Sequence, residues 1–456
     1  MNQLLRNLQT SFRLTAMLML AVAVSQAVPA LAYDSRPFLE GINAIRLFNQ
    51  SASPGEKEAH QKKVSILVEK ALDNSPAYRE QKQNVAAASA DIGAARGQLS
   101  PQIRATAQSR QTDGDVTAAT KANGKPSVAL AGELVLYDWG RINAQIDGRV
   151  AAESASRARM VAVANQVASE AITTCLEFKK QVALREVANT YIESIRKFVQ
   201  MLTTIVDYDP GRSSEMVQAK SRMLQAESNL LLVASKQREI SVRLTRIFGG
   251  EDQSICEQVE GSFRELPNKE AVLNLIPSIP QIVALGHDLN QQKRQADQFA
   301  ASKKPLVQFT AGYTPANPSV SNNYISSVAV VVTAPLFDGG VLDSNQKAAL
   351  ERTGSIEERR DQLKRQLQSE LTERWVQANT NFTRADDFIG LLEINNRVRK
   401  DFFQQWAELG RRSMYELLAI EQEQFQLEAN YVSALYDALS LSAQIRGISG
   451  QFMSFE

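Results

Sequence analysis

The chain has 456 residues, with 51 lysines and arginines against 50 aspartates and glutamates, 44% hydrophobic residues, two histidines and two cysteines. A near-neutral chain with intermixed charges is a poor partner for nucleic acid, which needs a basic patch to neutralise its phosphates. His60 and His287 stand in no metal-ligand spacing, and no HExxH, GxSxG or GxxxxGK[ST] motif occurs. We therefore expect no enzyme, no metal and no cofactor.

Residues 1–32 have the pattern of a secretory signal peptide. Arg6 and Arg13 precede an apolar run that ends in the small-residue cleavage pattern ALA at 30–32. Removing this segment changes the net charge from +1 to −1, because it takes away two arginines and no acid. The next residue is Tyr33, so the cysteine of a lipid anchor is missing from its usual place. No later run of about 18 apolar residues predicts a membrane-spanning helix.

Proline and glycine landmarks recur in the same order in the two halves of the chain. Two prolines are 25 residues apart in both halves, the next two glycines are 71 and 70 apart, and the last two are 38 and 37 apart. We infer that the mature chain is two copies of one unit. The landmarks are Pro76, Pro101, Gly140, Gly211 and Gly249 in the first copy and Pro280, Pro305, Gly340, Gly410 and Gly447 in the second.

The copies span residues 33–249 and 278–450, joined by a connector at 250–277 and followed by a short tail at 451–456. Each copy has two segments with the two-residue alternation of a strand; Ile103 and Ala105, for example, alternate with Arg104. Strands of about 9–11 residues have the length that a tilted strand needs to cross a bilayer. The predicted strands are 102–112 and 127–138, then 305–314 and 324–337.

Each pair of strands is followed by a long helical pattern. Residues 141–208 and 341–409 contain no proline and are rich in alanine, glutamate, glutamine, arginine and leucine. Such helices are about 100 Å long. Shorter return helices are expected at 212–249 and 412–447, and one helix precedes each pair of strands.

The joint between strand and helix repeats as LYDWG and LFDGG. Asp138 and Asp338 suit a helix N-cap, and Gly140 and Gly340 permit a sharp change of direction. The aromatic residues Tyr137 and Phe337 suit the girdle of a membrane interface.

Four strands per chain are too few to close a transmembrane barrel, since the smallest have about eight. Open strand edges are not tolerated in lipid. Several chains must therefore share one barrel. Two chains give eight strands and three give twelve, and the sequence alone does not determine the number of chains.

The segments ALDNSPAY, AARGQLSP, LYDWGR, APLFDGG and the closing stretch that begins GRRSMYELL make residues 60–450 resemble the TolC-like outer-membrane efflux proteins. The resemblance implies a mainly α fold with a small transmembrane β part. It implies a homotrimer whose twelve-stranded β-barrel is continuous with a long periplasmic α-helical barrel. It also implies an exit duct that receives substrate from an inner-membrane transporter through a periplasmic adaptor.

The resemblance assigns roles to the turns between long and return helices. It places a periplasmic gate at Arg412 and Glu416, with Glu215 as the acidic partner from the first copy. The sequence departs from the family pattern at Ala419, where the family has a second acidic ring. This difference argues against strong cation selectivity. The positions matched to adaptor docking are Pro210, Gly211 and Arg212 in the first turn, and Leu409, Gly410 and Arg411 in the second.

Cys175 and Cys256 are expected at similar heights in this architecture. Cys175 lies about 52 Å along the long helix from Gly140, and Cys256 follows the end of the return helix. We predict a disulfide near the middle of the tunnel; the alternative is two separate buried thiols.

The expected location is the outer membrane, with the helices in the periplasm. LYDWGR, the missing anchor cysteine and the short tail favour type I protein secretion over the alternative, a multidrug efflux pump. Whether the inner-membrane partner is an ABC or a proton-driven transporter stays open. A different class remains as a further alternative, a soluble periplasmic coiled-coil scaffold whose strands form a small capping sheet.

Overall fold

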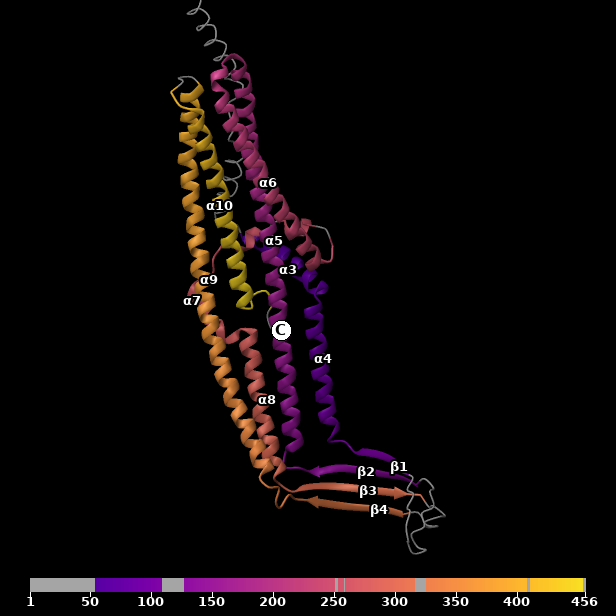
Figure 1. Ribbon diagram of the computed structural model, residues 1–456. Helices are drawn as coiled ribbons and strands as arrows, with labels where there is room; N and C mark the ends of the chain where they lie inside the picture. Colours follow the sequence, from indigo (N-terminus) through magenta and orange to yellow (C-terminus); the bar gives the residue numbers. More distant parts are fainter. Residues whose placement is uncertain are drawn as a thin grey trace, which may run out of the picture. The chain divides into compact units, whose positions relative to one another are not determined.

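The computed structural model describes residues 54–108, 127–250, 253–257, 259–315, 325–407 and 411–453. The predicted signal peptide lies outside these residues. The described chain is mainly helical, with one four-stranded antiparallel sheet (Figure 1). The main helices are α3 (Pro54–Asn74), α4 (Pro76–Gly97), α5 (Arg141–Tyr208), α6 (Ser213–Phe248), α8 (Pro280–Ser302), α9 (Val341–Ala407) and α10 (Met414–Ile448).

The chain divides into two compact units. Unit 1 comprises Met1–Asn74, Ala168–Lys269 and Thr372–Arg446, and unit 2 comprises Ser75–Val167, Glu270–Leu371 and Gly447–Glu456. The long helices α5 and α9 contribute to both units. In the part of the chain that the structure describes, no helix is long and apolar enough to cross a membrane.

The sheet of unit 2 has the strand order β1-β2-β3-β4, and every neighbouring pair is antiparallel. The pairing of β2 with β3 joins the two copies of the repeat. Among the strands that the structure describes, β1 and β4 each have a neighbour on one side only. The strands are β1 (Gln102–Gln108), β2 (Ser127–Tyr137), β3 (Leu306–Thr314) and β4 (Ile325–Thr333).

The strand boundaries differ from the prediction mainly at the end of β4. The predicted strand 324–337 is too long, because β4 ends at Thr333. Pro335 follows two residues later and has no N–H to donate to a ladder, so pairing stops before it. Of the predicted strand 102–112, residues 109–112 lie outside the described part.

The helices begin and end where local capping places them. α4 starts with Pro76 in its first turn, where a missing N–H is harmless, and the Ser75 hydroxyl accepts the Tyr78 N–H at 3.3 Å. At the end of α6, Asn74 donates to the carbonyls of Arg246 and Ile247, both at 3.0 Å. The end of α3 thus caps the end of α6 within unit 1.

The return helices start slightly later than predicted. Arg212 belongs to the 3-10 turn η3 (Pro210–Arg212), so α6 starts at Ser213. In the second copy α10 starts at Met414, because Ser413 caps it. Residues 408 and 409, the last two of the predicted long helix, lie outside the described part.

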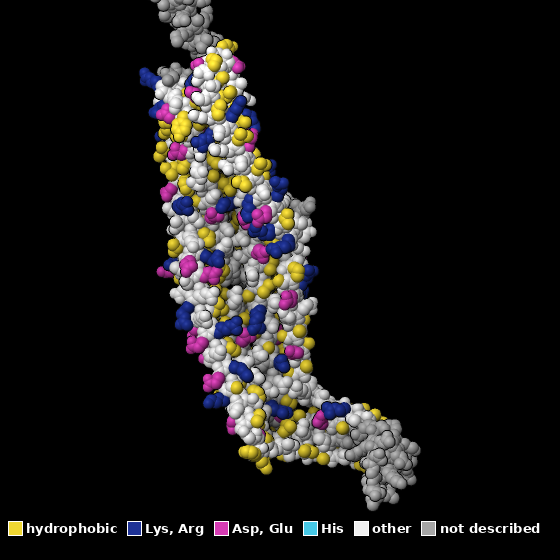
Figure 2. All heavy atoms as spheres, viewed as in Figure 1, with side chains coloured by type: hydrophobic (Ala, Val, Ile, Leu, Met, Phe, Trp, Pro, Cys, Tyr) yellow, Lys and Arg dark blue, Asp and Glu magenta, His cyan; other side chains and the backbone are white. Residues whose placement is uncertain are grey.

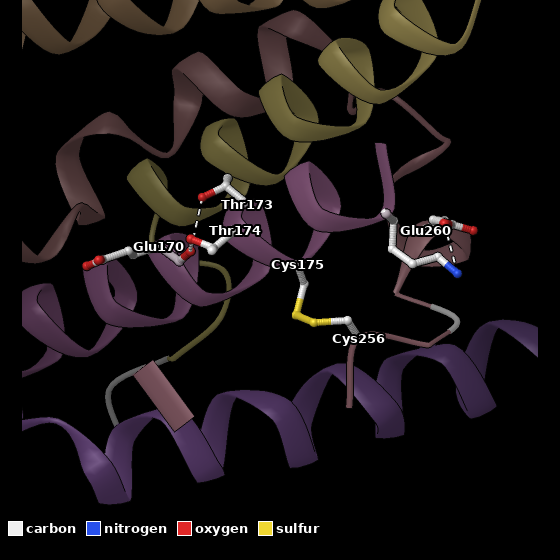
Figure 3. The surroundings of a disulfide bond; sticks show 7 residues. Glu170, Thr173, Thr174, Cys175, Cys256 and Glu260 are labelled. Atoms are coloured by element: carbon white, nitrogen blue, oxygen red, sulfur yellow. Dashed lines mark hydrogen bonds and ion pairs between the residues drawn. A yellow bond between two sulfur atoms is a disulfide. The ribbon is translucent and has the colours of Figure 1, made fainter. Parts of the chain in front are cut away.

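The connector is bonded to α5 in unit 1. It contains η4 (Gln253–Cys256), η5 (Glu260–Phe263), α7 (Lys269–Asn274) and η6 (Ile276–Ser278). A disulfide joins Cys175 of α5 to Cys256, with a Cα–Cα distance of 5.2 Å and both side chains fully buried (Figure 3). This is the pairing expected from the helix lengths. Further hydrogen bonds hold the connector, among them those from the Tyr436 hydroxyl to Glu260 and from the Trp375 indole to the Pro267 carbonyl.

Candidate functional site at the helix turns

The turn before α10 contains a capping box. The Ser413 hydroxyl accepts the Glu416 N–H at 3.3 Å, and the Glu416 carboxylate accepts the Ser413 N–H at 2.9 Å. The same carboxylate pairs with Arg412, at 2.8 Å from Nη1 to Oε1. The Ser413 N–H and the Arg412 guanidinium hold the pKa of Glu416 below its ordinary value. Glu416 is thus engaged within its own turn.

Arg412 links this turn to the end of α9. Its Nε donates to Oε1 of Gln405 at 3.0 Å, and its guanidinium lies 4.3 Å from the centre of the Phe402 ring. With the bond to Glu416, the guanidinium has contacts on both sides of the turn. Arg412 therefore holds the last turns of α9 to the start of α10.

The turn before α6 contains an equivalent pair. Asp209 accepts the Gly211 N–H at 3.1 Å and so shapes η3. Arg212 pairs with Glu215, with Nη2 and Oε2 3.3 Å apart. The Arg212 guanidinium lies 5.9 Å from the centre of the Trp406 ring, which belongs to α9. An arginine of the first copy thus lies against a helix of the second.

The gate residues pair within their own turns in the single chain. Among the described contacts, Glu215 pairs with Arg212 and Arg412 pairs with Glu416. The physical reason is reach, since residues three and four apart on one helical turn are direct neighbours. The structure therefore contains two separate arginine–glutamate pairs, one in each turn.

The predicted docking residues are only partly described. Pro210 and Gly211 are exposed, Arg212 is half-buried, and Arg411 is exposed in the second turn. Leu409 and Gly410 lie outside the described residues. Ala419, where the family's second acidic ring is expected, is exposed on α10.

An apolar cluster supports both turns from inside unit 1. It brings together side chains of α5, α6, α9 and α10, and Leu202, Met414 and Leu417 are fully buried in it. Sequence reasoning missed Phe402 and Trp406, the aromatic residues against which the two arginines lie. It also missed Ser413, although the pattern SMYE at 413–416 is that of a capping box.

The two joints in unit 2 have the geometry that their sequences predicted. Asp138 accepts the N–H groups of Gly140 and Ile142 at 3.0 and 2.7 Å. Asp338 accepts those of Gly340 and Leu342 at 2.9 and 2.8 Å. Gly140 and Gly340 both have φ of 83°, a conformation that favours glycine.

The fold described above is that of outer-membrane proteins of known structure. VceC of Vibrio cholerae matches with a TM-score of 0.72 and 18% identity, over 87% of this chain and 97% of that one. CmeC of Campylobacter jejuni matches with 0.71 and 15%, over 86% and 87%. MtrE of Neisseria gonorrhoeae, solved in an open state, matches with 0.68 and 15%, over 86% and 90%. At these identities the likeness establishes the fold.

The sequence itself also matches a known family. Residues 67–250, a stretch that contains most of the first copy, match the model of the outer membrane efflux protein family. The resemblance to TolC-like proteins is thereby confirmed. The family consists of transport channels rather than enzymes. No curated protein matches the chain.

Proposed function

We propose that this protein is a homotrimeric outer-membrane channel, the exit duct of a tripartite export system. Three chains would contribute twelve strands to one barrel in the outer membrane, and their long helices would form a periplasmic tunnel. The observation that carries the proposal is the sheet of unit 2, which has one apolar exposed face and two open edges.

The two faces of the sheet differ in chemistry. The pairing puts Leu134, Phe309 and Val330 in one row across three strands. Val328, Val330 and Val332 of β4 lie on the same face, and their exposed fractions are 71%, 61% and 62%. Hydrophobic side chains are uncovered over the sheet in Figure 2. An apolar face of this kind marks an interaction site, and alternation of apolar and polar residues is the pattern of a strand in a membrane barrel.

The opposite face is polar and suits a water-filled lumen. Arg104 and Glu133 lie 3.9 Å apart on it, both largely exposed. Thr310 lies directly opposite Glu133 in the pairing of β2 with β3. Charged and hydroxyl side chains on one face and valines on the other would separate water from lipid.

The open edges argue for more than one chain. Among the strands that the structure describes, β1 and β4 each have a neighbour on one side only, and a backbone group left unpaired in lipid costs several kcal/mol. Pairing of β4 in one copy with β1 of the next removes both edges. Three copies give twelve strands, the number that the family resemblance implies.

The turns provide the gate of the proposed channel. Arg412 and Glu416 hold the α9–α10 turn, while Arg212 and Glu215 hold the α5–α6 turn. In a three-fold assembly each pair would occur three times around the periplasmic mouth. The proposed docking sites for the adaptor are Pro210, Gly211 and Arg212 in the first turn and Leu409, Gly410 and Arg411 in the second.

Single-channel conductance in planar bilayers tests this function. Arg412→Gln is expected to raise conductance because it removes the contacts between α9 and α10, and Glu416→Gln is expected to do the same. Arg411→Gln is the matched control: it removes the same charge at the neighbouring position, where no contact with Glu416 exists. A purified protein that never forms conducting pores would refute the proposal.

Within this function we favour type I protein secretion over multidrug efflux, chiefly because of LYDWGR in the first joint. Affinity purification of the crosslinked complex tests the choice. Co-purification of an adaptor with an ABC transporter supports secretion, and co-purification of a proton-driven pump supports multidrug efflux. The scaffold alternative needs no apolar sheet face, and release of the protein from membranes by high salt alone would favour it.

A further inference from the structure

A layer of buried polar side chains crosses unit 1 next to the turns. Ser194 of α5, Arg399 of α9 and Glu421, Gln424 and Glu428 of α10 are all less than 10% exposed. Along α10 the layer extends to Glu428, about 18 Å from Glu416. Buried charged groups are rare unless they are paired, and this layer belongs to none of the pairs in the turns.

Glu421 connects three helices. Its Oε2 accepts the Ser194 hydroxyl of α5 at 2.9 Å and lies 3.6 Å from Nη1 of Arg399 on α9. Arg399 also donates to Oδ1 of Asn396 at 3.0 Å. The Ser194 bond reaches from the helix pair of the first copy to that of the second. The layer therefore ties α10 to α5 as well as to α9.

The layer contains one arginine and two carboxyl groups. Gln424 donates to Oε1 of Glu428 at 2.7 Å, but Glu428 forms no ion pair with any residue that the structure describes. A buried carboxylate without a cationic partner is costly, and such a group takes up a proton instead. With Arg399 placed on Glu421, the second carboxyl group is the one that holds the proton.

The surroundings agree with that assignment. Burial raises the pKa of Glu428 to about 7, and the charge of Glu421 acts in the same direction, whereas the Gln424 hydrogen bond and Arg399 oppose it. Burial also raises the pKa of Glu421, against the effects of Arg399 and Ser194.

The other ionisable groups around the layer come from α5, α6, α9, α10 and the connector. Burial raises the pKa of Tyr191 in α5; the charge of Arg222 on α6 lowers it and that of Glu421 raises it. Burial also raises the pKa of Tyr431 in α10; Arg264 of the connector lowers it and Asp386 of α9 raises it. The charges that act directly on Glu428 are those of Arg399 and Glu421.

We propose that Glu428 is a proton-binding site that keeps α10 packed against α5 and α9, so that loss of its proton loosens α10 next to the turn. We call this contact of protonated Glu428 with its neighbours the lock, and all of its residues belong to unit 1. Its consequence for opening of the channel rests on the proposed function.

The direction of the pH effect follows from linkage. When α10 separates locally, Glu428 regains its ordinary pKa near 4.5. The closed packing therefore binds more protons between about pH 4.5 and 7, and its stability falls as the pH rises through this window. Between pH 6 and 8.5, the equilibrium constant for local opening is expected to rise about tenfold.

Hydrogen–deuterium exchange of the full detergent-solubilised protein tests the lock. Rates for peptides within 414–432, corrected for the intrinsic pH dependence of exchange, are expected to rise about tenfold from pH 6 to 8.5. Glu428→Gln mimics the protonated side chain, so its rates are expected to stay unchanged. Glu423→Gln, an exposed position on the same helix, is expected to behave like the unmodified chain.

An unmodified chain without this rise in exchange, or a Glu428→Gln variant with the same rise, overturns the proposal. If Glu428→Gln does not fold, the pH dependence of exchange in the unmodified chain still tests the proposal. Bilayer recordings of the same preparations separate the lock from the channel: the open fraction is expected to rise with pH in the unmodified chain and not in Glu428→Gln. A pH-dependent exchange without any pores would uphold the lock and refute the proposed function.

Discussion

The two strand-to-helix joints have the same backbone conformation but different surroundings. In the first, the Trp139 indole donates to the Pro305 carbonyl at 2.8 Å, and Lys304 lies 5.1 Å from the centre of its ring. In the second, Leu336 and Phe337 are 97% and 92% exposed. The first joint has β3 beside it, whereas the second follows β4 at the open edge of the sheet.

The difference shows which part of the repeat depends on a neighbour. Leu336 and Phe337 are almost completely exposed, and large apolar side chains exposed to this extent mark an interaction site. In the proposed barrel, lipid and the next chain would contact them at this edge. The first joint is about half covered within its own chain, since Leu136, Tyr137 and Trp139 are 51%, 54% and 45% exposed. The duplication thus places one joint after an interior strand, β2, and the other after an edge strand, β4, and the sequences of the two joints have diverged accordingly.

Trp139 illustrates this divergence. Its φ is 60°, a left-handed conformation that costs a residue other than glycine about 1–2 kcal/mol. The second joint has Gly339 at this place, with φ of 66°. The indole hydrogen bond and the contact with Lys304 offset the cost in the first copy. In the second joint no described strand lies on the outer side of β4, and position 339 is glycine.

The largest expected difference between the copies comes from the disulfide, which joins α5 of the first copy to the connector and has no counterpart on α9 of the second copy. Replacing both Cys175 and Cys256 with serine is expected to lower the free energy of unfolding by about 4 kcal/mol, because the bond closes a long loop. The free energy of unfolding is measured in detergent by the loss of helical circular dichroism as denaturant is added. Reductant should destabilise the unmodified chain and leave the double variant unchanged. Equal stability of the two proteins would mean that the connector is held by its hydrogen bonds alone.

The repeat, the long helices and the joints were predictable because they follow from period and spacing. Proline, glycine and capping residues act through local backbone geometry, which a sequence displays directly. The end of β4 was also visible in principle, since Pro335 cannot pair within a ladder.

The side-chain pairs were not predictable in the same way. Assigning Glu215 to Arg212 rather than to Arg412 requires the position of each turn relative to the helices around it. The buried layer escaped notice because Ser194, Arg399 and Glu421 are far apart in the chain and meet only after three helices pack. Polar residues in a long helical pattern are normally assigned to the solvated face.

An intermediate effect is expected from the capping aspartates. Asp138→Ala is expected to cost about 1 kcal/mol, because two backbone N–H groups at the start of α5 lose their acceptor. Asp338→Ala removes the same two bonds, but its joint is exposed, so water replaces the acceptor and the loss is smaller. Amide exchange at Ile142 and Leu342 measures the two losses separately. Equal losses would show that burial of the first joint contributes nothing to its cap.

The smallest expected effect concerns the two glutamates of the turns. Glu416 accepts a backbone N–H in addition to its ion pair, whereas the only described contact of Glu215 is the ion pair with Arg212. Because the pKa of Glu416 is lowered in the folded turn, its stabilising effect is present above about pH 4.5 and is lost as the pH falls through the lowered value.

Glu416→Gln is therefore expected to speed amide exchange at the start of α10 about threefold at pH 7, the size of one exposed charged contact, and to leave it unchanged at low pH, where Glu416 is already protonated. Glu215→Gln should have a smaller effect at the start of α6. Exchange of the two peptides in one sample, at neutral and at acidic pH, makes the comparison. If Glu215→Gln had the larger effect, the capping box would not be what distinguishes the second turn from the first.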